Sequence, residues 1–173
     1  YPKHISANIV TVSHDHGDHN STSQIEDSPY IVSGPGEYEI QGVGIVGLAS
    51  FHDATKGSER GSNTIYRIEI DGVSIVHLGD LGHTLDSETV DALDGVDILL
   101  IPVGGFYTLD PEKANAVIKE VEPSIVIPMH YQIPRHNPKA FGDVKSLDVF
   151  LKEMGKEGTV PVPKLTITKD KIP

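Results

Sequence analysis

The sequence predicts one mixed α/β domain built from packed layers. Its 173 residues are enough for one domain with its own hydrophobic core, but hardly for two. Short β-rich segments fill the first half of the chain, and strands alternate with helical segments in the second half. Antiparallel strands followed by strand–helix–strand units are typical of layered α/β folds. We therefore expect residues 1–173 to form a single domain.

The first half of the chain is predicted to consist of short strands. Residues 7–12 are apolar and end at a polar run, a pattern typical of a buried strand. Glycine and proline then separate several apolar or alternating segments, which favours a meander of strands joined by turns. The strands expected in this meander are residues 30–33, 37–41 and 43–50, and a polar loop is expected at residues 51–62.

A β-hairpin is the clearest local prediction. Two β-rich segments, residues 63–70 and 73–78, flank the dipeptide Asp71-Gly72. Both residue types tolerate the positive φ angles of a type I′ turn, whose twist matches that of paired antiparallel strands. These two segments are therefore expected to pair with each other.

After the hairpin, the chain is predicted to alternate between helix and strand. The best-defined helix covers residues 111–121, because Asp110 can cap its first turn and Pro111 fits its first position. The other expected helices are residues 87–93 and 143–154, and the expected strands are residues 96–102, 124–128 and 164–168.

The composition excludes several kinds of function. The chain has no cysteine, which excludes disulfides, thiolate zinc sites, iron–sulfur clusters and cysteine nucleophiles. Its net charge of −11 disfavours binding to nucleic acid or to anionic membranes. No apolar stretch approaches the roughly 18 residues that cross a bilayer. The acidic residues concentrate in residues 1–134 with most of the nine histidines, which fits either a cation-binding region or a solvated acidic surface.

A dense cluster of metal-ligand side chains follows the first predicted strand. It reads His14-Asp15-His16-Gly17-Asp18-His19. Imidazole and carboxylate are the ligands that suit zinc, manganese, iron or cobalt when thiolate is absent. Residues two apart in an extended segment project to the same side, so His14 and His16 can converge on one cation. Gly17 allows a turn that lets Asp18 and His19 face a second cation.

Two further predicted strands end in potential ligands. The strand at residues 73–78 leads to Asp80, and the strand at residues 124–128 leads to His130. If these strands lie side by side, their ends bring both side chains to the edge that holds the histidine cluster. Alone, each would be read as a turn aspartate or a structural histidine. Together with the cluster they indicate a metal site.

These motifs resemble the successive metal motifs of the metallo-β-lactamase-fold hydrolases. The branch that the chain resembles most is a widespread group of metal-dependent hydrolases that is also similar to ascorbate-6-phosphate lactonase. The resemblance covers residues 5–172 and implies an αββα sandwich. The residues that carry it are His14-x-His16-x-Asp18-His19, His52, Gly79-Asp80 and Pro128-Met129-His130-Tyr131.

The resemblance implies two divalent metal ions that share Asp80 as a bridging ligand. Zinc is expected first, although nitrogen and oxygen ligands suit manganese and iron as well. His83 or His136 could replace His52, which lies in a predicted loop. The implied ligands are His14, His16 and His52 around one ion, and Asp18, His19 and His130 around the other.

Other side chains near the motifs carry weaker expectations. Tyr131 and residues 104–107 could line the site, or they could be ordinary packing and turn residues. His83 has the same two interpretations. His77 lies inside a predicted strand and is expected in the core rather than as a ligand, whereas His4 is expected at the surface.

The chain departs from the family's usual pattern in two ways. Family members usually begin with two or three more strands and an early aspartate near the site, and nothing precedes Tyr1 here. A missing layer would leave apolar surface and an open strand edge, which favours a homo-oligomer or instability. The β-lactamases proper often use a cysteine ligand. A bridging Asp80 instead points to the lactonase, thioesterase-like and phosphodiesterase branches.

The activity implied by the resemblance is hydrolysis by a water activated between two metal ions. The expected substrate is a small molecule with an ester, lactone, thioester or phosphoester bond. Asp18 or Asp80 would accept the proton of the water, and His83 or a second water would protonate the leaving group.

Two alternatives stay open at this point. A metallo-nuclease would use the same metal pair but needs a basic channel, which the net charge disfavours even though the region from Arg135 onward is basic. A non-catalytic metal-binding module would hold metal in an incomplete shell. The absence of cysteine and of a leader sequence is compatible with a cytoplasmic location.

Overall fold

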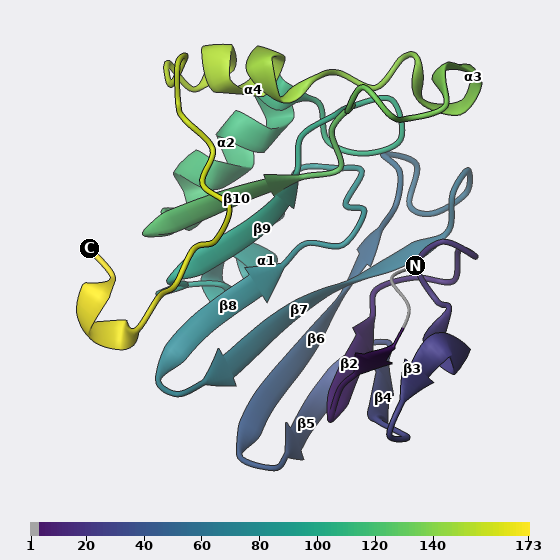
Figure 1. The fold of residues 1–173 in the computed structure, drawn as a ribbon, viewed down its shortest axis with the longest axis vertical. Coiled ribbons are helices and arrows are strands. Elements are labelled where there is room, and N and C mark those ends of the chain that lie inside the picture. Colours follow the sequence, from purple (N-terminus) through teal and green to yellow (C-terminus); the bar gives the residue numbers. More distant parts are fainter. Residues whose placement is uncertain (1–3) are drawn as a thin grey trace.

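One six-stranded sheet forms the centre of the fold (Figure 1). The computed structural model describes residues 4–173. Strands β5 to β8 pair antiparallel, whereas β8, β9 and β10 run parallel, which confirms the predicted mixed α/β class. In their order across the sheet, the strands are β10 (Ile125–Met129), β9 (Ile98–Pro102), β8 (Val73–His77), β7 (Ser62–Ile70), β6 (Val43–Phe51) and β5 (Gly36–Ile40).

The predicted hairpin is confirmed between β7 and β8. Ile70 pairs with Val73, and the turn residues Asp71 and Gly72 have φ angles of 51° and 74°. Positive φ at both turn residues is what a type I′ turn requires. Because the turn fixes the pairing register, it also fixes where β8 ends and therefore where Asp80 lies.

Helices cover one face of the large sheet. Helix α1 (Ser87–Ala92) connects β8 to β9, and α2 (Pro111–Val121) connects β9 to β10. The Asp110 carboxylate accepts a hydrogen bond from the Lys113 N–H at 2.8 Å, which confirms the predicted cap of α2. The core on this face contains Ala114, Val117, Ile118 and Val121 from α2 and Val76, Leu99 and Ile101 from the sheet.

Helix α4 (Leu147–Glu153) packs on the same core but begins later than predicted. The sequence predicts a helix over residues 143–154. In the structure, the Lys145 N–H donates to the Gly104 carbonyl at 2.7 Å, and the Lys145 carbonyl accepts from the Gln132 N–H at 2.9 Å. These bonds hold the backbone against two neighbouring loops, so the helix can start only after them.

A small two-stranded sheet packs on the other face. Its strands β2 (Ile9–Val12) and β4 (Tyr30–Ser33) are parallel, and Val32 joins Ile45 and Tyr66 of the large sheet in a second core. The sequence assigns β4 to a meander with β5 and β6. That assignment is wrong, because β4 pairs with β2, and only β5 and β6 continue into the large sheet.

Tyr66 connects the two sheets. Its buried hydroxyl donates to the Val12 carbonyl at 2.9 Å and accepts from the Gly34 N–H at 3.0 Å. The outer side chains of β4 are open to solvent, with Tyr30 60% and Ile31 46% exposed. Beside this layer lie the short pair β1 (Ile5–Ser6) and β3 (Ile25–Glu26) and the 3-10 turn Thr22–Gln24.

The strand predicted at residues 164–168 is wrong. These residues form no strand, and Leu165 is 56% exposed, so its apolar side chain does not pack in a core. Pro161 and Pro163 precede the segment and cannot donate to a strand ladder. The chain end is instead held by Lys169, whose Nζ lies 2.8 and 2.7 Å from the two carboxylate oxygens of Asp97.

The strands that matter for function end at one edge of the large sheet. Strand β7 is antiparallel to both β6 and β8, so β6 and β8 run in the same direction, and β9 and β10 are parallel to β8. The ends of β6, β8 and β10 therefore lie along one edge (Figure 1). Among residues 4–173, no helix is long and apolar enough to span a membrane.

Replacing Lys169 with alanine should destabilise the fold by no more than about 1 kcal/mol, because the lysine is partly exposed. Lys169 and the Ser74 N–H hold the pKa of Asp97 below its ordinary value of 3.8. Since the folded state favours the charged carboxylate, the stabilisation is present at neutral pH and is lost as the pH falls below about 4. Urea titrations at pH 7 and pH 3 measure it, with Lys171→Ala as the control. An equal loss at both pH values would contradict the account.

Candidate metal centre

Four strands deliver potential metal ligands to one place. His14 follows β2, His52 follows β6, Asp80 comes shortly after β8, and His130 follows β10. The sequence analysis expects the side chains after β8 and β10 to reach the histidine cluster if the strands lie side by side. The structure places them there.

The carboxylate of Asp80 lies at the centre of this group. Its Oδ2 atom is 3.3 Å from His52 Nε2, 3.4 Å from His130 Nε2, 3.6 Å from His19 Nε2 and 3.7 Å from His14 Nε2. Two ligand atoms on one tetrahedral zinc ion, each about 2.0–2.2 Å from the metal, lie roughly 3.3–3.6 Å apart. The observed separations, 3.3 to 3.7 Å, lie within this range or just above it, so these side chains are close enough together to bind a metal ion.

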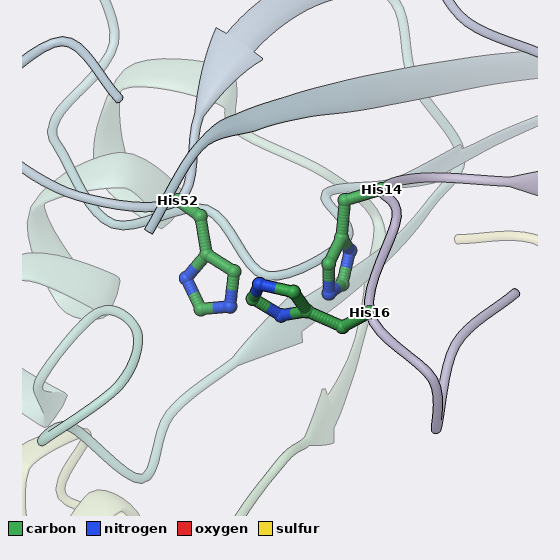
Figure 2. Close-up of side chains that lie close together, drawn as sticks. All are labelled: His14, His16 and His52. Carbon is green, nitrogen blue, oxygen red and sulfur yellow. The ribbon is translucent and has the colours of Figure 1, made fainter. Parts of the chain in front are cut away.

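His16 completes a group of three imidazoles with His14 and His52 (Figure 2). Its ring centroid lies 4.7 Å from that of His14 and 5.0 Å from that of His52. Each of the three residues offers one ligand atom, and these atoms lie within 4.8 Å of one another. His14, His19 and Asp80 form a second group within the same limit.

The hydrogen bonds of His14 show that the site suits a cation. Its Nδ1 lies 2.9 Å from the Ser13 hydroxyl, which orients the ring, while its buried Nε2 has no hydrogen-bond partner among the described residues. A buried polar atom left without a partner costs free energy. A metal ion would satisfy this nitrogen, and a partner on the other ring nitrogen is typical of metal-bound histidine.

Burial and neighbouring charges give Asp80 and His14 the protonation states in which these residues bind metal. Burial raises the pKa of Asp80, but the hydrogen bond from His52 and the charges of His130, His19 and His14 lower it more, to about 2. Burial lowers the pKa of His14 to about 4, against the opposing effect of Asp80. At neutral pH Asp80 is therefore ionised and His14 is neutral, the protonation states that bind metal.

Asn63 holds the backbone that carries Asp80. This buried side chain at the start of β7 accepts the Asp80 N–H at Oδ1 over 2.9 Å. Its Nδ2 donates to the Leu78 carbonyl at 2.9 Å and to the Ser50 hydroxyl at 2.7 Å. One side chain thus fixes both ends of the turn between β8 and Asp80.

The same turn requires glycine at position 79. Gly79 has a φ angle of +59°, and a Cβ there would lie 2.8 Å from the Ser13 Cβ and would also overlap the side chain of Asn63. The close approach brings the segment that precedes His14 against the segment that precedes Asp80. Any side chain at position 79 would push the two ligands apart.

Asp53 orders the loop that follows His52. Its carboxylate accepts hydrogen bonds from the N–H groups of Thr55, Gly57, Glu59 and Arg60, at 2.8 to 3.1 Å, and from the Thr55 hydroxyl. Burial raises the pKa of Asp53, but these bonds lower it more, so that it lies well below the ordinary value. The predicted polar loop is therefore a fixed structure beside the site.

A pocket opens next to His130. It measures about 400 Å³, and its lining includes Asp18, His19, His130, Tyr131 and Phe141 of the short helix α3 (Pro138–Phe141). His130 has a φ angle of 52°, a left-handed conformation that is costly for a residue with a side chain. Such strain is typical of functional positions, and here it sets the direction in which the imidazole leaves β10.

Asp18 and His19 lie on the open side of the centre. Asp18 Oδ2 is 3.7 Å from His19 Nε2, and the two side chains are 75% and 31% exposed. The Asp18 side chain is more exposed than those of His14, His52, Asp80 and His130. Its carboxylate is therefore accessible to both the pocket and the solvent.

The two alternatives to His52 lie outside the cluster. The Nε2 of His83 accepts the Phe51 N–H at 3.1 Å, and its Nδ1 lies 2.7 Å from the Thr84 carbonyl. His136 packs on Phe141 with ring centroids 4.8 Å apart. Because backbone groups occupy both nitrogens of His83, the hydrogen bonding favours a supporting position over the proton-donor role that the sequence suggests.

The remaining histidines lie where the sequence places them. The Nδ1 of His77 accepts the Gly79 N–H at 3.0 Å, and burial lowers the pKa of His77. His4 is exposed and pairs with Glu26 at 2.8 Å. Among the described residues, neither belongs to a group of clustered potential ligands.

The sequence analysis missed three residues beside the centre: Asn63, Asp53 and Arg60. Asp53 could have been found, because Asp-x-Thr directly after a strand is typical of a turn in which the carboxylate binds backbone N–H groups. Asn63 and Arg60 carry no such local signal. Their partners lie on other segments of the chain.

Comparisons with known proteins agree with this geometry. The model of a family described as the beta-lactamase superfamily domain matches residues 1–130. A UPF0173 metal-dependent hydrolase from Thermococcus onnurineus is 30% identical over 155 residues, which cover 75% of this chain and 69% of the relative. A protein of the same description from Thermoplasma acidophilum is 27% identical over 165 residues, covering 81% of this chain and 74% of the relative.

A solved structure gives the same result. A Thermotoga maritima protein, described as a candidate Zn-dependent hydrolase of the metallo-beta-lactamase superfamily, is 34% identical with a TM-score of 0.73. The match covers 86% of this chain and 70% of that protein. The resemblance to ascorbate-6-phosphate lactonase stays a prediction. The fold, the order of the ligand motifs and these relatives together show that the chain belongs to the metallo-β-lactamase superfamily.

Proposed function

We propose that this chain is a metal-dependent hydrolase that holds two divalent cations on either side of Asp80. The observation that carries the proposal is the convergence of four imidazole Nε2 atoms, from three separate segments, within 3.3 to 3.7 Å of one buried Asp80 oxygen. With His16 there are five imidazoles, and a single cation in tetrahedral geometry could not use them all together with Asp80. The related proteins named above as metal-dependent hydrolases support the reaction class.

The ligands divide into two sets. Asp80 has two carboxylate oxygens and belongs to both sets. The two proposed sets are His14, His16 and His52 on the buried side, and Asp18, His19 and His130 on the side of the pocket. His14 and His52 are buried and His16 is partly buried, which suits a cation held permanently, and the greater exposure of the second set suits contact with substrate.

Divalent cations at this place would lower the pKa of a water molecule to about 7 and polarise a carbonyl or phosphoryl oxygen. The residues of the chain hold the geometry in which that chemistry can occur. Asp80 stays ionised at the pH of the reaction, and Asn63 keeps its backbone fixed. The strained backbone of His130 aims its imidazole at Asp80 from the pocket side.

Asp18 is the proposed proton acceptor. Its carboxylate lines the pocket, and its exposed side chain can pass a proton from the attacking water to bulk solvent. Asp80 is a weaker candidate, because its pKa of about 2 disfavours protonation. The leaving group would take its proton from solvent, since backbone groups occupy both ring nitrogens of His83.

The proposed substrate is a small molecule with an ester, lactone or phosphoester bond. The pocket beside His130, at about 400 Å³, lies in the size range of small-molecule sites. Its lining combines apolar and aromatic groups with the proposed ligands, as binding sites for organic molecules commonly do. The net charge of −11 disfavours a nucleic acid in this position.

A metal-reconstitution screen tests the proposal. The protein is stripped with chelator and reloaded with zinc, manganese or iron. It is then assayed on lactones, carboxylic esters, phosphodiesters, β-lactams and single-stranded RNA. We expect two metal ions per chain by elemental analysis, and hydrolysis of a small-molecule substrate that chelator abolishes and metal restores. His4→Ala, a surface histidine outside the centre, is the matched control and should behave as wild type.

Three outcomes would contradict the proposal. Hydrolysis that survives in the metal-free protein would exclude a metal mechanism. Two bound metals without hydrolysis of any substrate would favour the non-catalytic module. Cleavage of RNA alone would favour the nuclease.

A further inference from the structure

We propose that Arg60 makes this site specific for substrates that carry an oxyanion, a carboxylate or a phosphate, beside the bond that is cleaved. The inference deepens the proposed function and rests on it. It assigns a role to a residue that the sequence motifs do not include. The observations behind it are the rigid loop that carries Arg60, the ring on which its side chain lies, and the unused donors of its guanidinium.

The backbone of Arg60 is fixed relative to the ligand His52. The Arg60 N–H donates to Asp53 Oδ2 at 2.8 Å, and the next residue, Gly61, receives the His52 N–H at its carbonyl over 3.1 Å. The loop from residue 53 to residue 61 therefore leaves the sheet beside His52 and returns to the same point. Arg60 stands at the end of this closed loop, next to the metal centre.

The side chain of Arg60 extends from its own loop to residues 106 and 107. Its Cζ lies 4.9 Å from the centre of the Tyr107 ring, and Nη2 is 3.5 Å from the Phe106 carbonyl. The Tyr107 hydroxyl donates to the Ala140 carbonyl at 2.8 Å, which holds the ring in place. The same ring lies 6.4 Å from the imidazole of His130. A single aromatic ring thus separates Arg60 from a proposed ligand on the pocket side.

Most donors of this guanidinium have no partner. Among the described residues, no carboxylate oxygen lies within 4.0 Å of a guanidinium nitrogen of Arg60, the distance that defines an ion pair. The guanidinium has one hydrogen-bond acceptor among these residues, the Phe106 carbonyl, at the long distance of 3.5 Å. By contrast, Arg67 pairs with Glu69 at 3.0 Å, and Lys169 pairs with Asp97. A half-buried, unpaired arginine is unusual in a chain with 25 acidic and 14 basic residues.

The chemistry of arginine suits an oxyanion here. A guanidinium can use its face on an aromatic ring while its N–H groups bind a carboxylate or phosphate in a two-pronged arrangement. Stacking on Tyr107 restricts the side chain before any substrate arrives, which lowers the entropy lost on binding. With divalent cations bound, the centre itself would attract an anionic group, and the positive charge of Arg60 would add to that attraction.

Binding measurements on the zinc-loaded protein test the inference without relying on turnover. The probes are phenylphosphonate, benzoate and the neutral benzamide, and binding is followed by calorimetry. We expect Arg60→Gln to lower the affinity for both anions, or for one of them, by about 10- to 100-fold, which is the loss expected when hydrogen bonds to a charged group are removed. Benzamide binding and metal content should not change. Which anion loses more identifies the carboxylate or the phosphate as the recognised group.

Two further variants separate recognition from a structural role. Lys56→Gln removes an exposed cation from the same loop and should leave all three affinities unchanged. Arg60→Lys keeps the charge without the two-pronged geometry and should restore only part of the anion affinity. If Arg60→Gln lowered the affinity for benzamide as much as the affinity for the anions, Arg60 would only hold the loop in place, and the inference would be wrong. Anion binding that does not depend on Arg60, or no anion binding at all, would also overturn it.

The outcome is distinguishable from failure of the proposed function. Anion binding that depends on Arg60, in a protein that hydrolyses no compound in the screen, would refute the hydrolase proposal and leave the anion subsite in place. Metal-dependent hydrolysis of neutral esters that is unchanged in Arg60→Gln, without Arg60-dependent anion binding, would refute only the subsite.

Discussion

Replacing Asp80 with alanine is expected to remove bound metal and hydrolysis together. Four histidines lie within 3.3 to 3.7 Å of one Asp80 oxygen, so this carboxylate can belong to both proposed ligand sets. Metal affinity should fall by more than about 100-fold, the upper range for loss of a residue that merely supports a ligand. Elemental analysis and a metal titration with a competing chelator measure the loss.

The Asp80→Ala protein should still fold. Because the folded state lowers the pKa of Asp80 to about 2, its charged carboxylate stabilises the apoprotein at neutral pH, so the variant should lose some stability, which urea unfolding of the apoprotein measures apart from the loss of metal. Asp15→Ala is the matched control, because Asp15 is an exposed aspartate of the same cluster whose carboxylate binds Asn20 rather than the histidines. Full metal content in Asp80→Ala, or the same loss in Asp15→Ala, would refute the bridging role.

Asn63→Ala is expected to have the second-largest effect. It leaves the buried Asp80 N–H and the Leu78 carbonyl without their partner, which should cost about 2 kcal/mol of folding stability. The turn that presents Asp80 would also lose its support, and metal affinity should fall by about 10- to 100-fold. Urea unfolding of the apoprotein and the chelator titration measure the two effects separately.

Ser74→Ala provides the comparison for Asn63→Ala. The Ser74 hydroxyl is buried but has no hydrogen-bond partner within residues 4–173. Its removal should therefore change folding stability only slightly and should leave metal affinity unchanged. A fall in stability without any fall in metal affinity in Asn63→Ala would show that Asn63 supports the fold but not the position of Asp80.

The convergence of the proposed ligands could be predicted because much of its signal is local. The spacing His14-x-His16-x-Asp18-His19 depends only on an extended backbone followed by a turn, and the ligands Asp80 and His130 each follow a strand that the apolar pattern identifies. The hairpin at Asp71-Gly72 could be predicted for the same reason, since two adjacent residues determine the turn type. The sequence placed His52 in the predicted loop at residues 51–62, and only the resemblance to the family marked it as a ligand. The structure shows it directly after β6 and beside Asp80.

Other features could not be predicted, because they depend on contacts between distant segments. Residues 143–146 read as helix, but their backbone bonds to loops near Gly104 and Gln132. A strand begins at Tyr30 as expected, but it belongs to the small sheet because it pairs with β2, and nothing in the residues of the strand itself indicates this partner. Asn63 and Arg60 look like ordinary strand and loop residues until the turn at Asp80 and the ring of Tyr107 are placed against them.

The most direct test of the central claim is anomalous X-ray scattering from crystals of the zinc-loaded protein, recorded on both sides of the zinc absorption edge. Two anomalous peaks are expected, one on each side of the Asp80 carboxylate. His14, His16 and His52 should surround one peak, and Asp18, His19 and His130 the other. One peak that Asp80 does not contact, or zinc bound elsewhere on the surface, would contradict the account.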